Sequence, residues 1–113
     1  MWRLRRGNKY NAQSSNYNGR SFDSKKEAAY AAELDLRKRA GDILDWTPQV
    51  KIPLDVNGHH IANYYIDFVV EHPNETREYV EVKGFETDVW RLKWKLFEAL
   101  YGDATNTRLT VIK

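Results

Sequence analysis

Hydrophobic and polar positions follow a β-strand pattern most clearly over residues 64–84. Two runs rich in β-branched and aromatic residues, 64–70 and 78–82, flank a polar segment that contains Pro73 and Asn74. Such a pattern predicts a β-hairpin. Because the runs are apolar on both faces, we expect the hairpin to lie in a sheet that is covered on both sides.

One further strand is predicted just upstream, and it pairs with the first strand of the hairpin. Apolar residues alternate with charged residues and a proline over residues 50–56, which is the pattern of a half-buried strand. The pair Asn57-Gly58 is a strong signal for a two-residue turn, after which the chain returns from His59 towards the hairpin. Pro53 cannot donate a backbone hydrogen bond, so it places this upstream strand at a sheet edge or at a bulge.

A helix is predicted ahead of these strands, over residues 24–40. The sequence from Ser24 to Glu27 fits a capping box, and Gly41 is a natural helix end. Several alanines favour the helix and permit close packing. The residues expected to face the core are Ala29, Ala32 and Leu36, with Tyr30 and Leu34 beside them.

A second helix is predicted over residues 88–101, with Thr87 as its N-cap and Gly102 at its end. Its expected core stripe is aliphatic and is widened by aromatic residues. The stripe consists of Val89, Leu92, Leu96 and Leu100, and the widening residues are Trp90, Trp94, Phe97 and Tyr101. We interpret Trp90 and Trp94 first as residues of the core or of a dimer contact, and only second as residues that stack on bases. Residues 109–112 complete the pattern as a fourth strand.

The predicted element order is α-β-β-β-α-β. It corresponds to an α/β (α+β) fold in which a four-stranded mixed sheet carries a helix on each face. We assign residues 21–113 to this single domain. Residues 1–20 are assigned to a flexible basic arm, because neither a helical nor a strand period holds there.

The composition narrows the function classes. A chain of 113 residues suits one modest core, and the absence of cysteine excludes disulfides, zinc–thiolate sites and a thiol nucleophile. The sequence has no apolar run that could cross a membrane, and its start lacks the apolar stretch of a signal peptide. We therefore expect a cytoplasmic protein that does not interact with a membrane.

The charges are distributed unevenly along the chain. Residues 1–51 contain 11 Lys or Arg and 6 Asp or Glu, whereas residues 52–113 contain 7 and 10. Five basic residues precede the first acidic residue, and aromatic residues are interleaved with them. These basic residues are Arg3, Arg5, Arg6, Lys9 and Arg20. The pattern is typical of an arm that contacts phosphates and stacks on bases, and its alternative is an ordinary disordered terminus.

A candidate site lies in the hairpin. Asp67 and Glu81 are symmetric about residue 74, so a loop with an odd number of residues places them opposite each other. Lys83 points to the same side as Glu81, because side chains alternate along a strand. Two carboxylates suit a hard cation such as Mg²⁺, and an amine beside them can stabilise charge on a phosphate. The alternative is a solvated sheet face with a Glu–Lys pair. We expect His59 and His60 to be surface residues, since neighbours on a strand cannot readily chelate one ion.

The element order, together with Asp67, Glu81-Val82-Lys83 and the helix residue Glu27, resembles the PD-(D/E)xK nuclease superfamily and its restriction-endonuclease-like core. The chain is more closely similar to small phage-encoded nucleases, some of which are described as Holliday-junction resolvases. The similarity spans about residues 21–113. One departure is Ile66, which stands where the superfamily name has Pro. The segments that carry the closer match are residues 22–28, 49–54, 65–68, 81–85 and 96–101.

The resemblance implies roles for individual residues. Asp67, Glu81 and the backbone carbonyl of Val82 would bind Mg²⁺, which Mn²⁺ could replace, and Lys83 would position the attacking water. Glu27 would complete the acidic cluster, although it also suits the capping role beside Ser24.

Gln49 is a further candidate, because it matches a glutamine of the small phage nucleases. A two-residue turn at residues 57–58 would pair Gln49 with Ile66, which faces away from Asp67. A bulge at Pro53 would reverse that pairing.

The activity implied is divalent-metal-dependent hydrolysis of DNA phosphodiesters, with a branched substrate such as a Holliday junction. Symmetric cutting needs two active sites, so we expect a homodimer, in the host cytoplasm if the protein is phage-encoded. One alternative is the same core acting on nicked, flapped or duplex DNA. Another is a non-catalytic nucleic-acid-binding module that uses the arm and the helix residues Arg91, Lys93 and Lys95.

Overall fold

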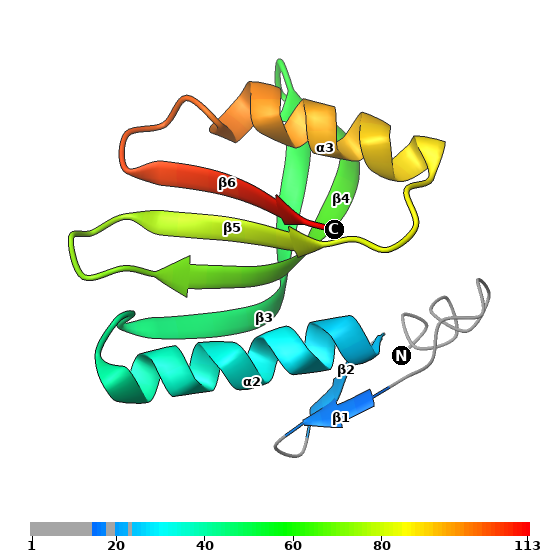
Figure 1. The fold of residues 1–113 in the computed structure, drawn as a ribbon. Helices are drawn as coiled ribbons and strands as arrows, with labels where there is room; N and C mark the ends of the chain where they lie inside the picture. The colour runs from blue at the N-terminus through cyan, green and yellow to red at the C-terminus, as the bar shows by residue number, and fades with distance from the viewer. Residues whose placement is uncertain (1–14, 18–19, 23) are drawn as a thin grey trace. The chain divides into compact units, whose positions relative to one another are not determined.

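The computed structural model describes residues 15–17, 20–22 and 24–113. Figure 1 shows its elements, which in order are β1 (Ser15–Tyr17), β2 (Arg20–Phe22), α2 (Lys25–Ala40), β3 (Asp45–Val56), β4 (His59–Glu71), β5 (Arg77–Val82), α3 (Asp88–Tyr101) and β6 (Thr107–Ile112). From α2 onward this is the predicted α-β-β-β-α-β order, and the α+β class with a four-stranded mixed sheet is confirmed. The chain divides into two units at Gly41, which we describe separately.

The first unit contains a short hairpin and a helix. Strands β1 and β2 pair antiparallel, with Tyr17 opposite Arg20, and the Tyr17 hydroxyl donates a hydrogen bond to Asp35 Oδ2 on α2 at 2.8 Å. The expectation that residues 1–20 lack strands is therefore wrong for Ser15–Tyr17 and Arg20. The other predicted DNA-binding residues of the arm lie outside the described residues; they are Arg3, Arg5, Arg6 and Lys9.

Helix α2 begins and ends where the sequence predicted. Ser24 is its N-cap, and the Ser24 hydroxyl oxygen accepts a hydrogen bond from the Glu27 N–H at 3.1 Å. Gly41 adopts the left-handed φ of 84°, which glycine tolerates best, and its N–H reaches the carbonyls of Arg37 and Lys38. The predicted position of α2 on a sheet face stays a prediction.

The predicted core face of α2 is wrong. Ala28, Ala31 and Leu34 are buried, whereas Ala29 is exposed and Leu36 is 61% exposed. Alanines on neighbouring sides of the helix give it almost no amphipathic pattern, so its sequence does not select one face. The buried side is the one that carries Glu27 and Leu34.

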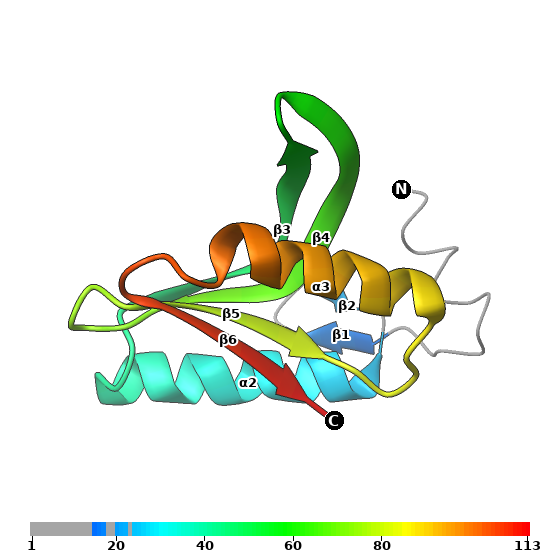
Figure 2. The same cartoon turned by 90° about the horizontal axis from the view of Figure 1, so that it is seen from above.

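The second unit is built on a sheet with the strand order β3-β4-β5-β6. The first three strands are antiparallel, and β6 runs parallel to β5. Strand β3, which contains Pro53, is an edge strand as predicted, and it begins at Asp45 rather than at residue 50. Asn57 and Gly58 form the predicted tight turn, with φ angles of 51° and 80°. The hairpin that ends in this turn bends away from the rest of the sheet (Figure 2).

Helix α3 packs on one face of this sheet through its aromatic residues. Trp94 and Phe97 are buried against a cluster from β3 and β4 that includes Leu54, Tyr64 and Val69. The Phe97 ring also meets the Tyr79 ring edge-on at a centroid distance of 5.2 Å. The apolar core of the second unit therefore lies between α3 and the sheet.

The predicted aliphatic core stripe of α3 is confirmed for Leu96, which packs against the core, and is wrong for its other three residues. Val89, Leu92 and Leu100 are 63%, 69% and 39% exposed. Aromatic side chains bury more area than aliphatic ones, so the helix turns its tryptophans and Phe97 inward. This rotation leaves an exposed aliphatic stripe on the outer side of α3. In the described part of the chain, neither helix has the length and apolar character needed to cross a membrane.

The two leucines of α2 provide a test of the observed helix face. Leu34 is fully buried, so Leu34→Ala should lower the free energy of unfolding by about 2–5 kcal/mol. Leu36 is mostly exposed, so Leu36→Ala should change it by about 0.5 kcal/mol or less. Urea denaturation of both variants measures the difference. A larger loss for Leu36→Ala would contradict this orientation of α2.

Candidate functional site

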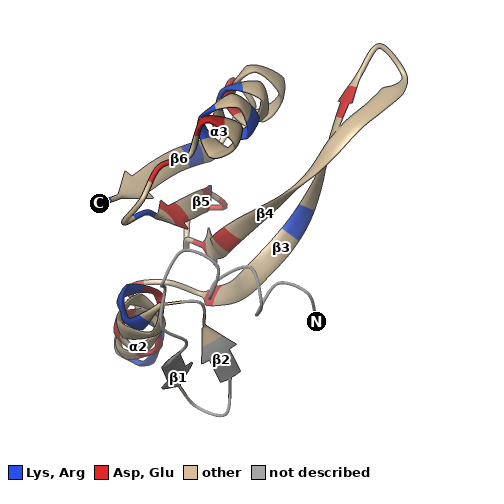
Figure 3. Ribbon diagram, turned by 90° about the vertical axis from the view of Figure 1, so that its right-hand side faces the viewer, with Lys and Arg blue, Asp and Glu red and all other residues tan. Residues whose placement is uncertain are grey.

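Asp67 and Glu81 face each other across β4 and β5. The paired residues of the two strands are symmetric about residue 74 and end at Phe68 and Val80, so the next positions in the same register are Asp67 and Glu81. This is the opposition that the sequence predicted. Figure 3 shows the acidic segments of the neighbouring strands β4 and β5.

The Asp67 carboxylate accepts a hydrogen bond that a backbone carbonyl of β4 would accept in a regular sheet. Its Oδ2 atom accepts a buried hydrogen bond of 2.8 Å from the Val82 N–H. The aspartate is thus held between two strands by a charge-assisted bond, which is stronger than a neutral one. Its position depends on the sheet and not on a flexible loop.

Both carboxylates are buried. Asp67 is 7% exposed and Glu81 is 3% exposed, so the alternative of a solvated, charged sheet face is wrong. Burying a charged group is costly unless partners compensate it. Lys83 is one such partner, because its Nζ lies 3.4 Å from Glu81 Oε2 on the predicted common side of β5.

Glu81 is only partly compensated. Its Oε1 atom is buried and accepts no hydrogen bond from any described residue. Burial raises the pKa of Glu81 above its ordinary value. The Lys83 ammonium, the Tyr64 hydroxyl and the Asp67 backbone N–H act in the opposite direction, since each favours the charged form.

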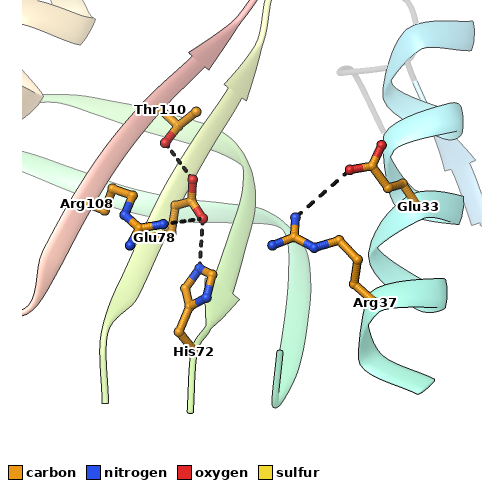
Figure 4. Close-up of polar contacts among 6 residues, drawn as sticks. All are labelled: Glu33, Arg37, His72, Glu78, Arg108 and Thr110. Carbon is orange, nitrogen blue, oxygen red and sulfur yellow. Dashed lines mark hydrogen bonds and ion pairs between the residues drawn. The ribbon is translucent and has the colours of Figure 1, made fainter. Parts of the chain in front are cut away.

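A second buried glutamate on the same strand shows what full compensation looks like. Glu78 Oε1 lies 2.8 Å from His72 Nε2 and 3.8 Å from an Arg108 guanidinium nitrogen, and Glu78 Oε2 accepts a hydrogen bond from the Thr110 hydroxyl at 2.5 Å (Figure 4). Both Glu78 oxygens therefore have partners within the second unit. Glu81, three residues away, keeps a buried oxygen aimed at no donor of the described chain, which is typical of a site that binds something.

Two aromatic residues complete the surroundings of Glu81. The Trp90 indole N–H donates to the Tyr64 hydroxyl oxygen at 3.0 Å, and the Lys83 Nζ lies 5.1 Å from the centroid of the Trp90 ring. The sequence did not identify Tyr64 or Trp90 as site residues. The available signal was chemical, because a tyrosine hydroxyl and an indole N–H each need a partner when they are removed from water.

Gln49 lies across from Asp67. The register of β3 and β4 shifts between Leu54 and Asp55, one residue beyond the bulge position considered from the sequence. This shift places Gln49 between the pairs Pro48–Phe68 and Val50–Ile66, and therefore opposite Asp67. Gln49 also has a φ of 54°, a left-handed conformation that is uncommon within a strand. The structure thus favours the bulged alternative.

The remaining predicted residues differ in their surroundings. Glu27 is buried in the first unit, and its membership of the acidic cluster stays a prediction. On α3, Arg91 pairs with Asp88 at 2.9 Å, Lys93 donates to the Asn63 carbonyl at 3.2 Å, and Lys95 is exposed.

The predicted surface position of His59 and His60 is confirmed, since both are exposed. The Nδ1 atom of His60 lies 2.6 Å from Asp55 Oδ1. This contact is made at the far end of the β3–β4 hairpin.

The donor set fits a hard divalent cation. Asp67 and Glu81 offer carboxylate oxygens, and the resemblance adds the carbonyl of Val82; Mg²⁺ prefers such oxygen ligands. No group of three or more His, Cys, Asp or Glu side chains suited to a metal occurs among the described residues. Asp67 and Glu81 are the two side chains of β4 and β5 that would bind such an ion, and the role of the Val82 carbonyl stays a prediction.

Glu81→Gln tests the cost of this burial. The pKa of Glu81 is raised in the folded state, so its charged carboxylate lowers the stability of the fold at pH values above that pKa. This loss of stability disappears once the pH falls below 4.5, the pKa of the same group in the unfolded chain. In EDTA, Glu81→Gln should therefore raise the Tm at pH 7, and the gain should shrink at pH 4. Thermal unfolding measured by circular dichroism gives both values.

Glu78→Gln is the matched control, because it removes charge from a buried glutamate that has partners for both oxygens. It should lower the Tm at pH 7. A drop in Tm for Glu81→Gln as large as that for Glu78→Gln would show that Glu81 is an ordinary structural residue.

Comparison with known proteins identifies a family but no characterised relative. Residues 7–113 match the family described as protein of unknown function (DUF1064). No curated protein matches the chain, and no solved structure matches it either. The match covers the described strands and helices and all the site residues discussed above, and the chain therefore belongs to the DUF1064 family.

Proposed function

We propose that this protein is a divalent-metal-dependent DNA endonuclease. The observation that carries the proposal is the pairing of two buried carboxylates, Asp67 and Glu81, with the Lys83 amine 3.4 Å from Glu81. Two buried acids beside an amine are costly for a fold to maintain, and such costs are concentrated at functional sites. The resemblance to PD-(D/E)xK nucleases supports the same assignment.

The reaction is hydrolysis of a phosphodiester. The oxygen of a water molecule bonds to phosphorus, a bridging P–O bond breaks, the water loses a proton and the departing oxygen gains one. When bound, Mg²⁺ or Mn²⁺ would supply Lewis-acid activation and neutralise phosphate charge. Asp67 and Glu81 would hold the ion with the Val82 carbonyl, and Lys83 would direct its N–H groups at the attacking water. Glu27 would add a further acid, and Gln49 would line the site opposite Asp67.

Branched DNA is the proposed substrate, by similarity to the small phage-encoded resolvases. The basic arm and Arg20 would contact phosphates, and the exposed Lys95 would add to this surface. The alternative substrates are nicked, flapped and duplex DNA. A purely binding module is less well supported, because it gains nothing from two buried carboxylates next to a phosphate. We place the activity in the cytoplasm, which is the host cytoplasm if the protein is phage-encoded.

A homodimer would supply the two active sites that symmetric cutting needs. We propose that two copies pair through the outer side of α3, where Val89, Leu92 and Leu100 are exposed. Val89 and Leu100 are equidistant from the midpoint between residues 94 and 95, and so are Arg91 and Glu98. In an antiparallel pair about that midpoint, Val89 would meet Leu100 of the partner subunit, and Arg91 would face Glu98 of the partner subunit. These two pairings are complementary in polarity and in charge.

The catalytic assignment predicts a defined mutant series. Asp67→Asn and Glu81→Gln should each lower the rate of Mg²⁺-dependent junction cleavage by about 100-fold or more, because each removes a charged ligand. Junction binding should be kept, since negative charge near the phosphates is reduced. Lys83→Ala should bind junction and cut poorly. Gel assays on a synthetic four-way junction, with duplex, nicked and flap controls, measure both properties.

The same assays separate the alternatives. If a linear duplex is cleaved as fast as the junction, the enzyme does not select branched DNA. Salt-sensitive binding without cutting in Mg²⁺ or Mn²⁺ would favour the binding module. Full activity of Asp67→Asn would remove the nuclease assignment from this site.

The proposed dimer also has a direct test. Leu92→Glu places a charge in the outer stripe of α3 and should convert a micromolar dimer into a monomer with an unchanged circular dichroism spectrum. Leu36→Glu is the matched control, because Leu36 is a similarly exposed leucine on α2. Sedimentation velocity measures the assembly state. A wild-type protein that is monomeric and still cuts junctions symmetrically would contradict the proposed pairing.

A further inference from the structure

We propose that Tyr64 and Trp90 are positioning residues for the site. They hold the Glu81 carboxylate in β5 and the ammonium of Lys83, which directly follows β5. This inference rests on the proposed function, since it assigns two further residues to the same site. The residues come from different elements, β4 and α3, and they meet at the end of β5. Neither belongs to the acidic cluster itself.

The direction of the hydrogen bonds follows from the chemistry of the groups. An indole N–H can only donate, so the Tyr64 oxygen must accept from Trp90 in the 3.0 Å contact. The Tyr64 hydrogen is then available for another acceptor. The Tyr64 hydroxyl favours the charged form of Glu81 and so lies beside its carboxylate, and both residues are buried, at 4% and 3% exposure. Because its oxygen accepts from Trp90, the Tyr64 hydroxyl keeps its hydrogen for the neighbouring Glu81 carboxylate.

Trp90 also anchors Lys83. The Lys83 Nζ lies 5.1 Å from the centroid of the Trp90 ring, within the range of a cation–π interaction, and 3.4 Å from Glu81 Oε2. The Lys83 backbone is fixed as well, because its N–H donates to the Ile112 carbonyl on β6 at 2.7 Å. A long lysine side chain is thus held at its base, at its tip and over a ring, which reduces the freedom of its ammonium.

Trp90 is itself fixed by contacts in the first turns of α3. The Thr87 side chain accepts a hydrogen bond from the Trp90 N–H at 3.0 Å, and the Trp90 ring stacks on Trp94 with a centroid distance of 6.0 Å. Trp94 is itself part of the core. The capped end of the helix therefore connects the core to the two groups of β5, and this explains why Trp90 faces the site rather than the solvent.

Three variants separate the two contacts. Tyr64→Phe removes only the hydroxyl. Trp90→Phe keeps a ring near Lys83 and loses the indole N–H, whereas Trp90→Leu loses both. Tyr101→Phe is the matched control, because it removes a tyrosine hydroxyl that donates to the Pro53 carbonyl at the other end of α3 and leaves the Trp90 contacts to Tyr64 and Lys83 in place.

The expected activity change lies in kcat and not in KM. Partners that orient a site typically contribute about 10–100-fold, so Tyr64→Phe and Trp90→Leu should each lower kcat for junction cleavage by that factor, with an unchanged KM for DNA. Trp90→Phe should retain more activity than Trp90→Leu, as the conservative variant. Tyr101→Phe should change the Tm without this loss of kcat. The same loss in Tyr101→Phe would reduce the effect to general packing and overturn the inference.

A measurement without turnover distinguishes this inference from the proposed function. The Trp90 ring should shift the NMR signals of the Lys83 side-chain methylenes upfield, and Trp90→Leu should abolish that shift while Trp90→Phe keeps part of it. A Mg²⁺ titration followed in the same spectra should show weaker binding for Tyr64→Phe. Normal kcat and normal Mg²⁺ affinity in Tyr64→Phe and Trp90→Leu would overturn the inference and leave the nuclease intact. A wild-type protein that neither binds Mg²⁺ nor cuts DNA would overturn both.

Discussion

The hydrogen bond from the Val82 N–H to the Asp67 carboxylate is the contact on which the candidate site depends. It places a charged side chain where a neighbouring strand would otherwise offer a carbonyl, and the regular pairing of β4 and β5 ends next to it. Because the bond is buried, water cannot replace it. Asp67 is thereby fixed to β5, which carries Glu81 and is followed directly by Lys83. Two acidic groups and one basic group are thus held at one end of this strand.

The two buried glutamates of β5 show how the same residue type serves two purposes on one strand. Glu78 is enclosed by His72, Arg108 and Thr110, and so it links the β4–β5 turn to β6. Glu81 is as deeply buried, yet one of its oxygens accepts no hydrogen bond from the described residues. A fold that only needed stability would gain by compensating or replacing that oxygen. The contrast is the physical reason for assigning chemistry to Glu81 and structure to Glu78.

Helix α3 joins the core, the site and the surface. Its aromatic side packs on the sheet, its capped first turn presents Trp90 to Tyr64 and Lys83, and its aliphatic side is exposed. A helix with two apolar sides can serve a core and a partner at once, which is why the amphipathic pattern alone does not reveal which side is buried. Packing settles it, since tryptophan and phenylalanine bury the larger area.

Apart from the short strands β1 and β2, the sequence by itself determined the elements, their order and the opposition of Asp67 and Glu81. These follow from local signals: side-chain alternation, the caps at Ser24, Thr87 and Gly41, and the turn at residues 57–58.

Only the tertiary structure decided the buried faces of α2 and α3, the bulge after Leu54 that brings Gln49 opposite Asp67, and the meeting of Tyr64 with Trp90. Each of these depends on which surfaces compete for burial and on contacts between residues far apart in the chain, such as the 26 positions that separate Tyr64 from Trp90. A periodic pattern states which sides of an element are apolar, and only packing selects the one that is covered.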